Sequence, residues 1–152
     1  MLILIVEDDP VQAQHMEAAI RRELGAEVWR MATEYDFQAG FEEIATRKPD
    51  LIVIDVMLRW ADPAEEIPDK PANWAQTGGY TRAGLRCHAM LRKDERTGEI
   101  PALLYTVLGQ EALGLLQGVE YLQKGNGLDR LLVGIKQLLS LAPAEPGVPP
   151  AP

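Results

Sequence analysis

Short runs of wholly apolar residues recur along the chain, and a stretch with helical patterning follows each of them. The clearest runs are LILIV at 2–6, LIVI at 51–54 and ALLY at 102–105. A strand with no polar alternation is buried on both faces, as in a parallel sheet that lies between two layers of helices. Weaker strand patterns at 27–31 and 121–123 bring the predicted strands to five. The chain is therefore predicted to be an α/β domain.

Helical patterns connect the predicted strands. The first helix opens at Asp9-Pro10, where Asp9 supplies an N-cap acceptor and the proline suits the first helical position, and it ends at Gly25. Four more helices are expected, at 34–47, 84–93, about 110–117 and 128–139. Five βα units in succession predict a doubly wound, five-stranded parallel sheet of the flavodoxin-like (βα)5 class, with strand order 2-1-3-4-5.

The charge balance excludes several kinds of partner. The 15 Lys and Arg residues against 23 Asp and Glu give a formal net charge of −8, whereas surfaces that bind nucleic acid or anionic membranes are basic. We therefore expect no nucleic-acid and no membrane partner. Cys87 is the single cysteine, so an internal disulfide is excluded. The opening MLILIVEDD lacks a basic n-region and no apolar run has transmembrane length, so we expect a cytoplasmic protein.

The C-terminal residues 142–152 have a composition of their own. They contain five prolines in eleven positions. Proline at this density cannot continue a helix or join a central strand, so we expect a disordered or polyproline II tail. The predicted domain therefore spans 1–141, and we expect no second domain behind it.

A long segment at 60–82 separates Asp55 from the helix that begins at Gly84, where a few residues usually suffice. It contains two of the three tryptophans, Trp60 and Trp74, and more acidic than basic residues. Large aromatic side chains are poor candidates for a freely solvated loop, so we interpret 60–82 as an ordered insertion. Two roles stay open for Trp60 and Trp74: a partner-binding surface, or packing of the insertion onto its own domain.

Polar residues follow the predicted strands where these end. Glu7 and Asp8 follow the first strand, and Asp55 follows the third. Thr106 follows the fourth strand and Lys124 the fifth. The carboxyl ends of parallel strands share one edge of the sheet, where open α/β sheets bind their ligands. Clustered carboxylates call for a compensating cation, and ligands that are all oxygen favour Mg²⁺.

This set of side chains suits phosphoryl transfer to a carboxylate. Asp55 would be the nucleophile. The metal, the Lys124 ammonium and the Thr106 hydroxyl would offset charge on the transferring phosphoryl oxygens. Each residue alone has a common structural explanation, such as a helix cap or a solvated surface charge. Their joint placement at four strand ends carries the prediction.

Four segments resemble the signature segments of receiver domains from two-component response regulators. In chain order they are ILIVEDDP, DLIVIDVML, PALLYT and EYLQKG. The resemblance covers roughly residues 1–141 apart from 60–82. It implies a stand-alone response regulator of a phosphorelay, which accepts a phosphoryl group on Asp55 from a histidine kinase or phosphotransfer protein. Signalling would then proceed through altered binding to a downstream protein, with a homodimer as a further option.

The resemblance also implies roles for individual residues. Asp8 would ligate Mg²⁺ directly and Glu7 mainly through water. Asp55 and the backbone carbonyl of Met57 would complete the protein ligands of the metal.

Three further residues match functional positions of the family. Thr106 matches the switch hydroxyl, and Lys124 matches the family's invariant lysine. Tyr121, three residues before Lys124, matches the aromatic side chain that changes rotamer on activation.

The sequence departs from the family pattern in four places. Gly125 replaces the usual proline after Lys124, and Val107 replaces the usual small residue after Thr106. The spacing from Thr106 to Lys124 is several residues short, so we expect a short or distorted fourth helix. The fourth departure is the insertion at 60–82. Gly125, Val107 and the short fourth helix favour an alternative function, a phosphorylation-independent interaction module that uses 60–82. The full set of acceptor, metal, hydroxyl and lysine positions favours the phosphorylated receiver.

A third hypothesis is a phosphohydrolase that forms an aspartyl phosphate. Enzymes of the haloacid dehalogenase type carry a second aspartate two residues after the nucleophile as the general acid. Met57 occupies that position here and cannot transfer a proton. We therefore expect a signalling domain that is not an enzyme, with self-catalysed phosphorylation and dephosphorylation only.

Overall fold

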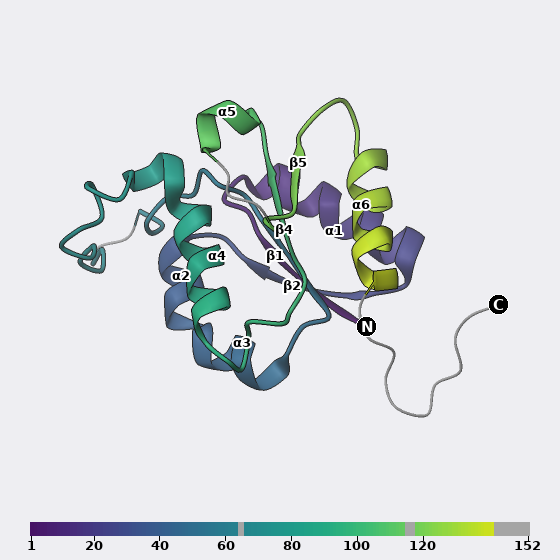
Figure 1. Ribbon diagram of the computed structural model, residues 1–152, viewed down its shortest axis with the longest axis horizontal. Coiled ribbons are helices and arrows are strands. Elements are labelled where there is room, and N and C mark those ends of the chain that lie inside the picture. Colours follow the sequence, from purple (N-terminus) through teal and green to yellow (C-terminus); the bar gives the residue numbers. More distant parts are fainter. Residues whose placement is uncertain (64–65, 115–117, 142–152) are drawn as a thin grey trace.

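The centre of the fold is a five-stranded parallel sheet with strand order β2-β1-β3-β4-β5 (Figure 1). The computed structural model describes residues 1–63, 66–114 and 118–141. The strands are β1 (Leu2–Val6), β2 (Glu27–Met31), β3 (Leu51–Ile54), β4 (Ala102–Thr106) and β5 (Tyr121–Gln123). All four strand pairings are parallel. The fold class and the strand order predicted from the sequence are confirmed.

Helices cover both faces of this sheet (Figure 1). They are α1 (Pro10–Leu24), α2 (Glu34–Ala39), α3 (Phe41–Arg47), α4 (Ala83–Lys93), α5 (Gln110–Leu113), α6 (Asp129–Leu141) and one 3-10 turn, η1 (Gly79–Arg82). One face is covered by α1 and α6, and the other by α2, α3 and α4. Within the described ranges, no helix combines the length and the apolarity that crossing a membrane requires.

Each central strand contributes to two hydrophobic cores, one on each face of the sheet. In β1, Ile3 and Ile5 belong to the core beneath α1 and α6. Leu4 and Val6 belong to the core beneath α2 and α4. All four side chains are fully buried. This double burial explains why the strand has no polar alternation.

Helix α1 begins and ends where the sequence predicts. Asp9 Oδ1 accepts hydrogen bonds from the backbone N–H groups of Val11 and Gln12, at 3.0 and 3.2 Å. Pro10 is the first helical residue, where its missing N–H has no cost. Gly25 ends the helix in the left-handed conformation, with φ of 62°. Because β1 ends at Val6 and α1 begins at Pro10, Glu7 and Asp8 lie in the short connection at the edge of the sheet.

The stretch 34–47 was predicted as one helix, and the structure divides it into α2 and α3 at Gly40. A Cβ atom at Gly40 would lie 2.6 Å from Met31 Cε and 3.0 Å from the Asp36 carbonyl oxygen. A side chain at position 40 would therefore have to displace the flexible end of Met31 and would lie close to the last turn of α2. The helix predicted at about 110–117 is short: α5 ends at Leu113, and 115–117 lie outside the described residues. So does the predicted tail at 142–152.

The described part of 60–82 consists of turns and η1, and Trp60 holds its beginning in place. Trp60 is buried, with 6% of its surface exposed. Its indole N–H donates to the carbonyl of Pro68 at 2.7 Å. Its ring meets Tyr35 edge-on at a centroid distance of 5.7 Å, and the Tyr35 N–H donates to the Trp60 carbonyl. Trp60 thus ties the segment to α2.

A buried carboxylate anchors the middle of the same segment. Glu34 is fully buried, and the Trp74 indole N–H donates to its Oε1 at 2.8 Å. Arg86 donates to both carboxylate oxygens, from Nε to Oε2 and from Nη2 to Oε1, each at 2.8 Å. Arg86 also donates to the carbonyls of Thr77 and Gly79, at 2.9 and 2.6 Å. The buried Glu34 carboxylate and the largely buried Arg86 guanidinium group therefore attach the segment to α2 and α4.

Both tryptophans pack the segment onto its own domain, which is one of the two roles that the sequence left open. Each indole N–H is used internally, and little of Trp60 is exposed. These contacts establish the packing role, and the use of Trp60 and Trp74 as a partner-binding surface stays a prediction.

Candidate functional site

Three carboxylates meet at the carboxyl edge of the sheet. Glu7 and Asp8 follow β1, and Asp55 follows β3. One carboxylate oxygen from each lies within 4.8 Å of the others. Backbone bonds fix both turns, since the Asp55 N–H donates to the Val6 carbonyl at 2.9 Å and the Glu7 N–H to the Met31 carbonyl at 3.0 Å. The sheet thus brings together the acids that the sequence predicted to be neighbours.

Lys124 provides the main positive charge of this edge. Its Nζ lies 2.9 Å from Asp55 Oδ2 and 2.8 Å from Glu7 Oε2. It also donates to Gln12 Oε1 at 2.5 Å. Burial alone would lower the pKa of Lys124, but the carboxylates of Asp55 and Glu7 outweigh burial and hold that pKa above its ordinary value. The ammonium group is therefore charged and fixed against the central aspartate.

The second oxygen of Asp55 is held by the backbone. The Met57 N–H donates to Asp55 Oδ1 at 3.2 Å, while Lys124 takes Oδ2. Asp55 is only 7% exposed. Both oxygens of this carboxylate are thus oriented before any ligand arrives, as a nucleophile requires.

Thr106 and Tyr121 contact the same residue beyond the end of β4. Thr106 is fully buried, and its Oγ1 accepts a long hydrogen bond of 3.4 Å from the Leu108 N–H. The Tyr121 hydroxyl donates to the Leu108 carbonyl. Val107, between Thr106 and Leu108 in the chain, has 53% of its surface exposed. The two predicted switch residues therefore bracket one short loop.

At the level of sequence, the chain resembles one curated regulator. No known protein-family profile matches the chain. The DNA-binding dual master transcriptional regulator RpaA of Synechocystis sp. is 29% identical over an alignment 147 residues long, which covers 90% of this chain and 48% of that protein. The chain thus spans about half the length of this curated relative.

Solved structures resemble the chain over almost its whole length. The signal receiver domain of a signal transduction histidine kinase from Syntrophus aciditrophicus has a TM-score of 0.68 and 23% identity, covering 97% of this chain and 96% of that one. The non-phosphorylated HemR receiver domain of Leptospira biflexa has a TM-score of 0.65 and 22% identity, covering 95% and 98%. The response regulator TrrA of Thermotoga maritima has a TM-score of 0.62 and 21% identity, covering 90% and 97%.

The chain has the receiver-domain fold. The resemblance predicted from the four sequence segments is therefore confirmed at the level of the fold. The acids, the lysine and the threonine singled out in the sequence lie at the carboxyl edge of the sheet. Tyr121 begins β5 opposite Leu104, and its hydroxyl reaches the Leu108 carbonyl beyond β4.

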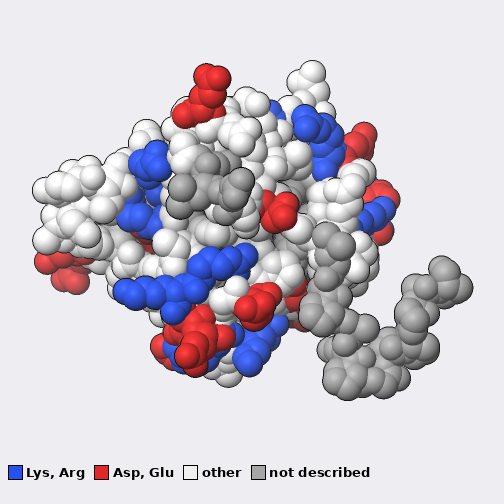
Figure 2. Space-filling view, in the orientation of Figure 1, with Lys and Arg blue, Asp and Glu red and all other residues white. Residues whose placement is uncertain are grey.

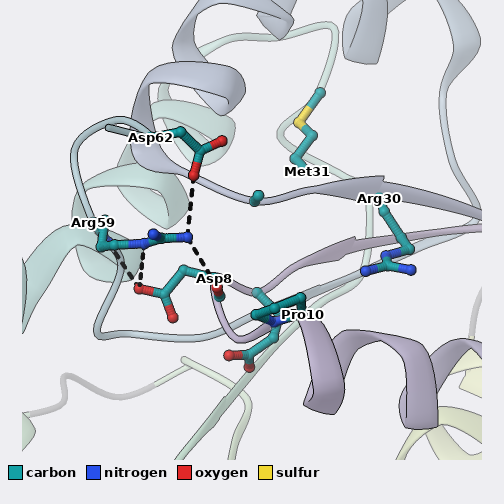
Figure 3. A pocket seen from close by; sticks show the side chains of 8 residues that line it. Asp8, Pro10, Arg30, Met31, Arg59 and Asp62 are labelled. Carbon is teal, nitrogen blue, oxygen red and sulfur yellow. Dashed lines mark hydrogen bonds and ion pairs between the residues drawn. The ribbon is translucent and has the colours of Figure 1, made fainter. Parts of the chain in front are cut away.

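Two residues of the receiver site escaped the sequence analysis. Gln12, on the first turn of α1, accepts a hydrogen bond from Lys124. Arg59, four residues after Asp55, contacts Asp8 through its backbone and its side chain. Arg59 and Arg30 line a cavity of about 360 Å³ that borders Glu7 and Asp8 (Figure 3). Only the position of Gln12, one turn from the acidic pair, was a usable signal in the sequence.

The donors of this receiver site fit a hard divalent cation. Burial and then the neighbouring Asp55 charge raise the pKa of Glu7 to about 7, although Lys124 opposes them. Burial also raises the pKa of Asp8 above its ordinary value. Both shifts show that crowding and burial disfavour the ionised carboxylates, and a divalent cation would supply the positive charge that favours them. Mg²⁺ takes carboxylate oxygens and keeps several waters, which suits a small partly open group of acids.

Proposed function

We propose that this chain is a phosphoacceptor receiver domain in which Asp55 takes a phosphoryl group from a phosphohistidine of a histidine kinase or phosphotransfer protein. The observation that carries the proposal is the setting of Asp55. It is nearly buried, with its two oxygens held by the Lys124 ammonium and the Met57 amide and with Glu7 and Asp8 beside it.

The chemistry required of these residues is limited. A carboxylate oxygen of Asp55 forms the new O–P bond while the P–N bond to the donor histidine breaks, and the imidazole leaves with the electron pair. Lys124 stays against the carboxylate and offsets charge on the phosphoryl oxygens. Gln12 positions Lys124 through the hydrogen bond to Nζ.

Asp8, Asp55 and the Met57 carbonyl would hold Mg²⁺, with Glu7 acting mainly through water. When bound, the metal would supply positive charge against the phosphoryl oxygens. The structure of TrrA, described as a complex with Mg²⁺ and BeF, supports this assignment by analogy of fold. The acidic cluster of this chain supports it by its donor set.

Signalling would begin at the loop held by Thr106 and Tyr121. A phosphoryl group on Asp55 offers oxygens that attract the Thr106 hydroxyl, whose present bond to Leu108 is long at 3.4 Å. Movement of Thr106 would release one side of Leu108, and Tyr121 holds the other. The surface beyond β4 would change with them, and we propose that a downstream protein reads this change.

The test is intact mass spectrometry after incubation with acetyl phosphate and Mg²⁺. The wild type is expected to gain one phosphoryl adduct that requires Mg²⁺. Asp55→Asn is expected to gain none, whereas Asp69→Asn, the same substitution at an exposed acid, is expected to behave as the wild type. An adduct that survives in Asp55→Asn would place the acceptor elsewhere.

A second function is favoured by the anchoring of 60–82. The Glu34–Arg86–Trp74 contacts hold this segment in a defined shape, as an interaction module would require. A folded wild type that gains no adduct would favour this phosphorylation-independent role. On the face shown in Figure 2, basic and acidic side chains are interspersed rather than gathered into one basic surface, which fits a protein partner better than nucleic acid.

A further inference from the structure

Arg59 meets Asp8 with both its backbone and its side chain (Figure 3). The Arg59 N–H donates to Asp8 Oδ2 at 3.0 Å, and its Nε lies 3.7 Å from the same oxygen. Its Nη2 donates to the Asp8 carbonyl at 3.1 Å. Among the described residues, no donor hydrogen-bonds to Asp8 Oδ1. One oxygen of Asp8 is therefore bound by Arg59, and the other has no donor within the described part of the chain.

The backbone and the side chain of Arg59 differ in freedom. The Arg59 carbonyl accepts a hydrogen bond from the Glu34 N–H at 3.0 Å, so the backbone is fixed at α2. The side chain is 42% exposed and also pairs with Asp62, 60% exposed, at 3.1 Å. An exposed side chain changes rotamer quickly. The guanidinium group can therefore leave Asp8 for Asp62 and water without moving the loop.

We propose that Arg59 is a built-in counter-cation of the acidic site, with which a divalent cation must compete for Asp8. This inference rests on the proposed function, because it requires a metal site that includes Asp8. Lys124 compensates Asp55 and Glu7 from one side, and Arg59 compensates Asp8 from the other. Metal binding displaces the guanidinium group toward Asp62 and so connects the state of the site to the first residues of 60–82.

The direction in which the affinity for Mg²⁺ changes when the Arg59 guanidinium group is removed distinguishes this role from a structural one. A guanidinium group and a divalent cation on the same carboxylate repel each other, so removing the guanidinium charge strengthens metal binding. Loss of a merely structural contact to Asp8 would loosen the ligand and weaken metal binding. The two roles predict opposite changes in affinity for Mg²⁺.

The experiment is a titration of the ¹⁵N-labelled full chain with Mg²⁺, followed by the amide NMR signals of 7–9 and 55–59. Arg59→Gln is expected to bind Mg²⁺ about tenfold more tightly than the wild type, the effect of one nearby charge in a partly screened site. Arg59→Lys keeps the charge and is expected to stay within about threefold of the wild type. In the wild type, the Arg59 Nε–H signal is expected to shift as Mg²⁺ binds.

Arg30→Gln is the matched control. Arg30 borders the same cavity but pairs with Glu17 at 3.3 Å, so this variant removes the same charge without touching Asp8. Its affinity is expected to change by less than about threefold, because charges farther away are screened by salt. An equal gain in Arg30→Gln and Arg59→Gln would overturn the inference, because general charge would then explain both.

Failure of the inference is distinguishable from failure of the metal site. Equal or weaker binding by Arg59→Gln, with binding lost in Asp8→Asn, overturns the role of Arg59 and leaves the metal site standing. An absence of saturable shifts in both the wild type and Arg59→Gln overturns the metal site and the inference with it. Saturation in Arg59→Gln at lower Mg²⁺ than in the wild type supports the inference.

Discussion

Arg86 and Glu34 form a two-point ion pair, with both hydrogen bonds 2.8 Å long and the carboxylate fully buried. A buried pair is strongly destabilising when one partner is removed, because the other charge is left uncompensated. This pair also connects three elements, since Glu34 lies on α2, Arg86 on α4, and Trp74 and Gly79 in the segment 60–82. The contacts of this segment with α2 and α4 therefore contribute to the stability of the domain.

Glu34→Gln is expected to lower the free energy of unfolding by about 3 kcal/mol. Glutamine has the shape of glutamate but leaves the Arg86 charge buried without its counter-charge. Urea unfolding followed by circular dichroism measures the loss. Tryptophan fluorescence measured in the same samples reports changes around the three tryptophans, of which Trp74 contacts Glu34 directly.

Glu42→Gln is the control for this prediction. Glu42 pairs with Arg96 at 2.7 Å, but both side chains are largely exposed. Exposed pairs contribute little, because water already solvates both charges. Equal effects of Glu34→Gln and Glu42→Gln would show that the buried pair does not anchor the segment.

Gly84→Ala is expected to damage both stability and phosphorylation. A Cβ atom at Gly84 would lie 2.1 Å from the Asp55 carbonyl oxygen and 2.6 Å from Val56 Cα. Both contacts are with backbone, so α4 and the loop that carries Asp55 must separate. The expected cost is about 1–3 kcal/mol in urea unfolding, and the phosphoryl adduct on Asp55 should form more slowly. Gly109→Ala, with nothing within 4 Å of the new Cβ, should change neither quantity.

The sheet and the acidic site could be predicted from local sequence. Burial on both faces leaves a continuous apolar run such as Ile3 to Val6, and that pattern needs no knowledge of the partner elements. Once the strands are parallel, residues that follow them meet at one edge. Glu7, Asp55 and Lys124 were therefore predictable neighbours although they lie far apart in the chain.

The parts that could not be predicted depend on long-range contacts without a local signature. Glu34 lies in the first turn of a helix, where an acidic residue is usually solvated. Its burial follows from Arg86, 52 positions away, and from Trp74, 40 positions away. Arg59 reaches Asp8 across 51 positions. Each of these contacts depends on the path of the chain between Asp55 and α4, which the sequence pattern does not specify.

Tyr121→Phe is expected to loosen the loop beyond β4. The variant removes the hydroxyl that donates to the Leu108 carbonyl, while Thr106 keeps its bond to the Leu108 N–H. Loss of one such bond costs about 1 kcal/mol. Hydrogen exchange should accelerate at the amides of 107–109, as measured by NMR.

Tyr35→Phe is the matched control for the tyrosine variant. Tyr35 is 38% exposed and packs its ring against Trp60, and its hydroxyl has no hydrogen-bond partner among the described residues. The ring contact survives in phenylalanine. Unchanged exchange at 107–109 in Tyr121→Phe, as in this control, would refute the role of Tyr121 in holding the loop.

His88 is expected to make the stability of the domain depend on pH near neutrality. Burial, followed by the charge of Arg92, lowers the pKa of His88 below its ordinary value of 6.5. Within the described part of the chain, His88 Nε2 is buried without a hydrogen-bond partner, so a proton there would have no acceptor. As the pH falls through about 6.5, the unfolded chain takes up a proton that the folded chain resists. The free energy of unfolding therefore decreases between that pH and the lower pKa of the folded state.

His88→Gln is expected to remove this part of the pH dependence, because glutamine does not titrate. Urea unfolding from about pH 7.5 to about pH 5.5 compares the two slopes across the range in which an ordinary histidine titrates. Carboxylates that titrate in the same range, Glu7 among them, are present in both proteins. Their contributions therefore cancel when the slope of the variant is subtracted from that of the wild type. His15→Gln, at an exposed position, should keep the slope of the wild type. If His88→Gln also keeps the slope of the wild type, the pH dependence arises from other groups. The neutral state of His88 then does not contribute to the stability of the fold.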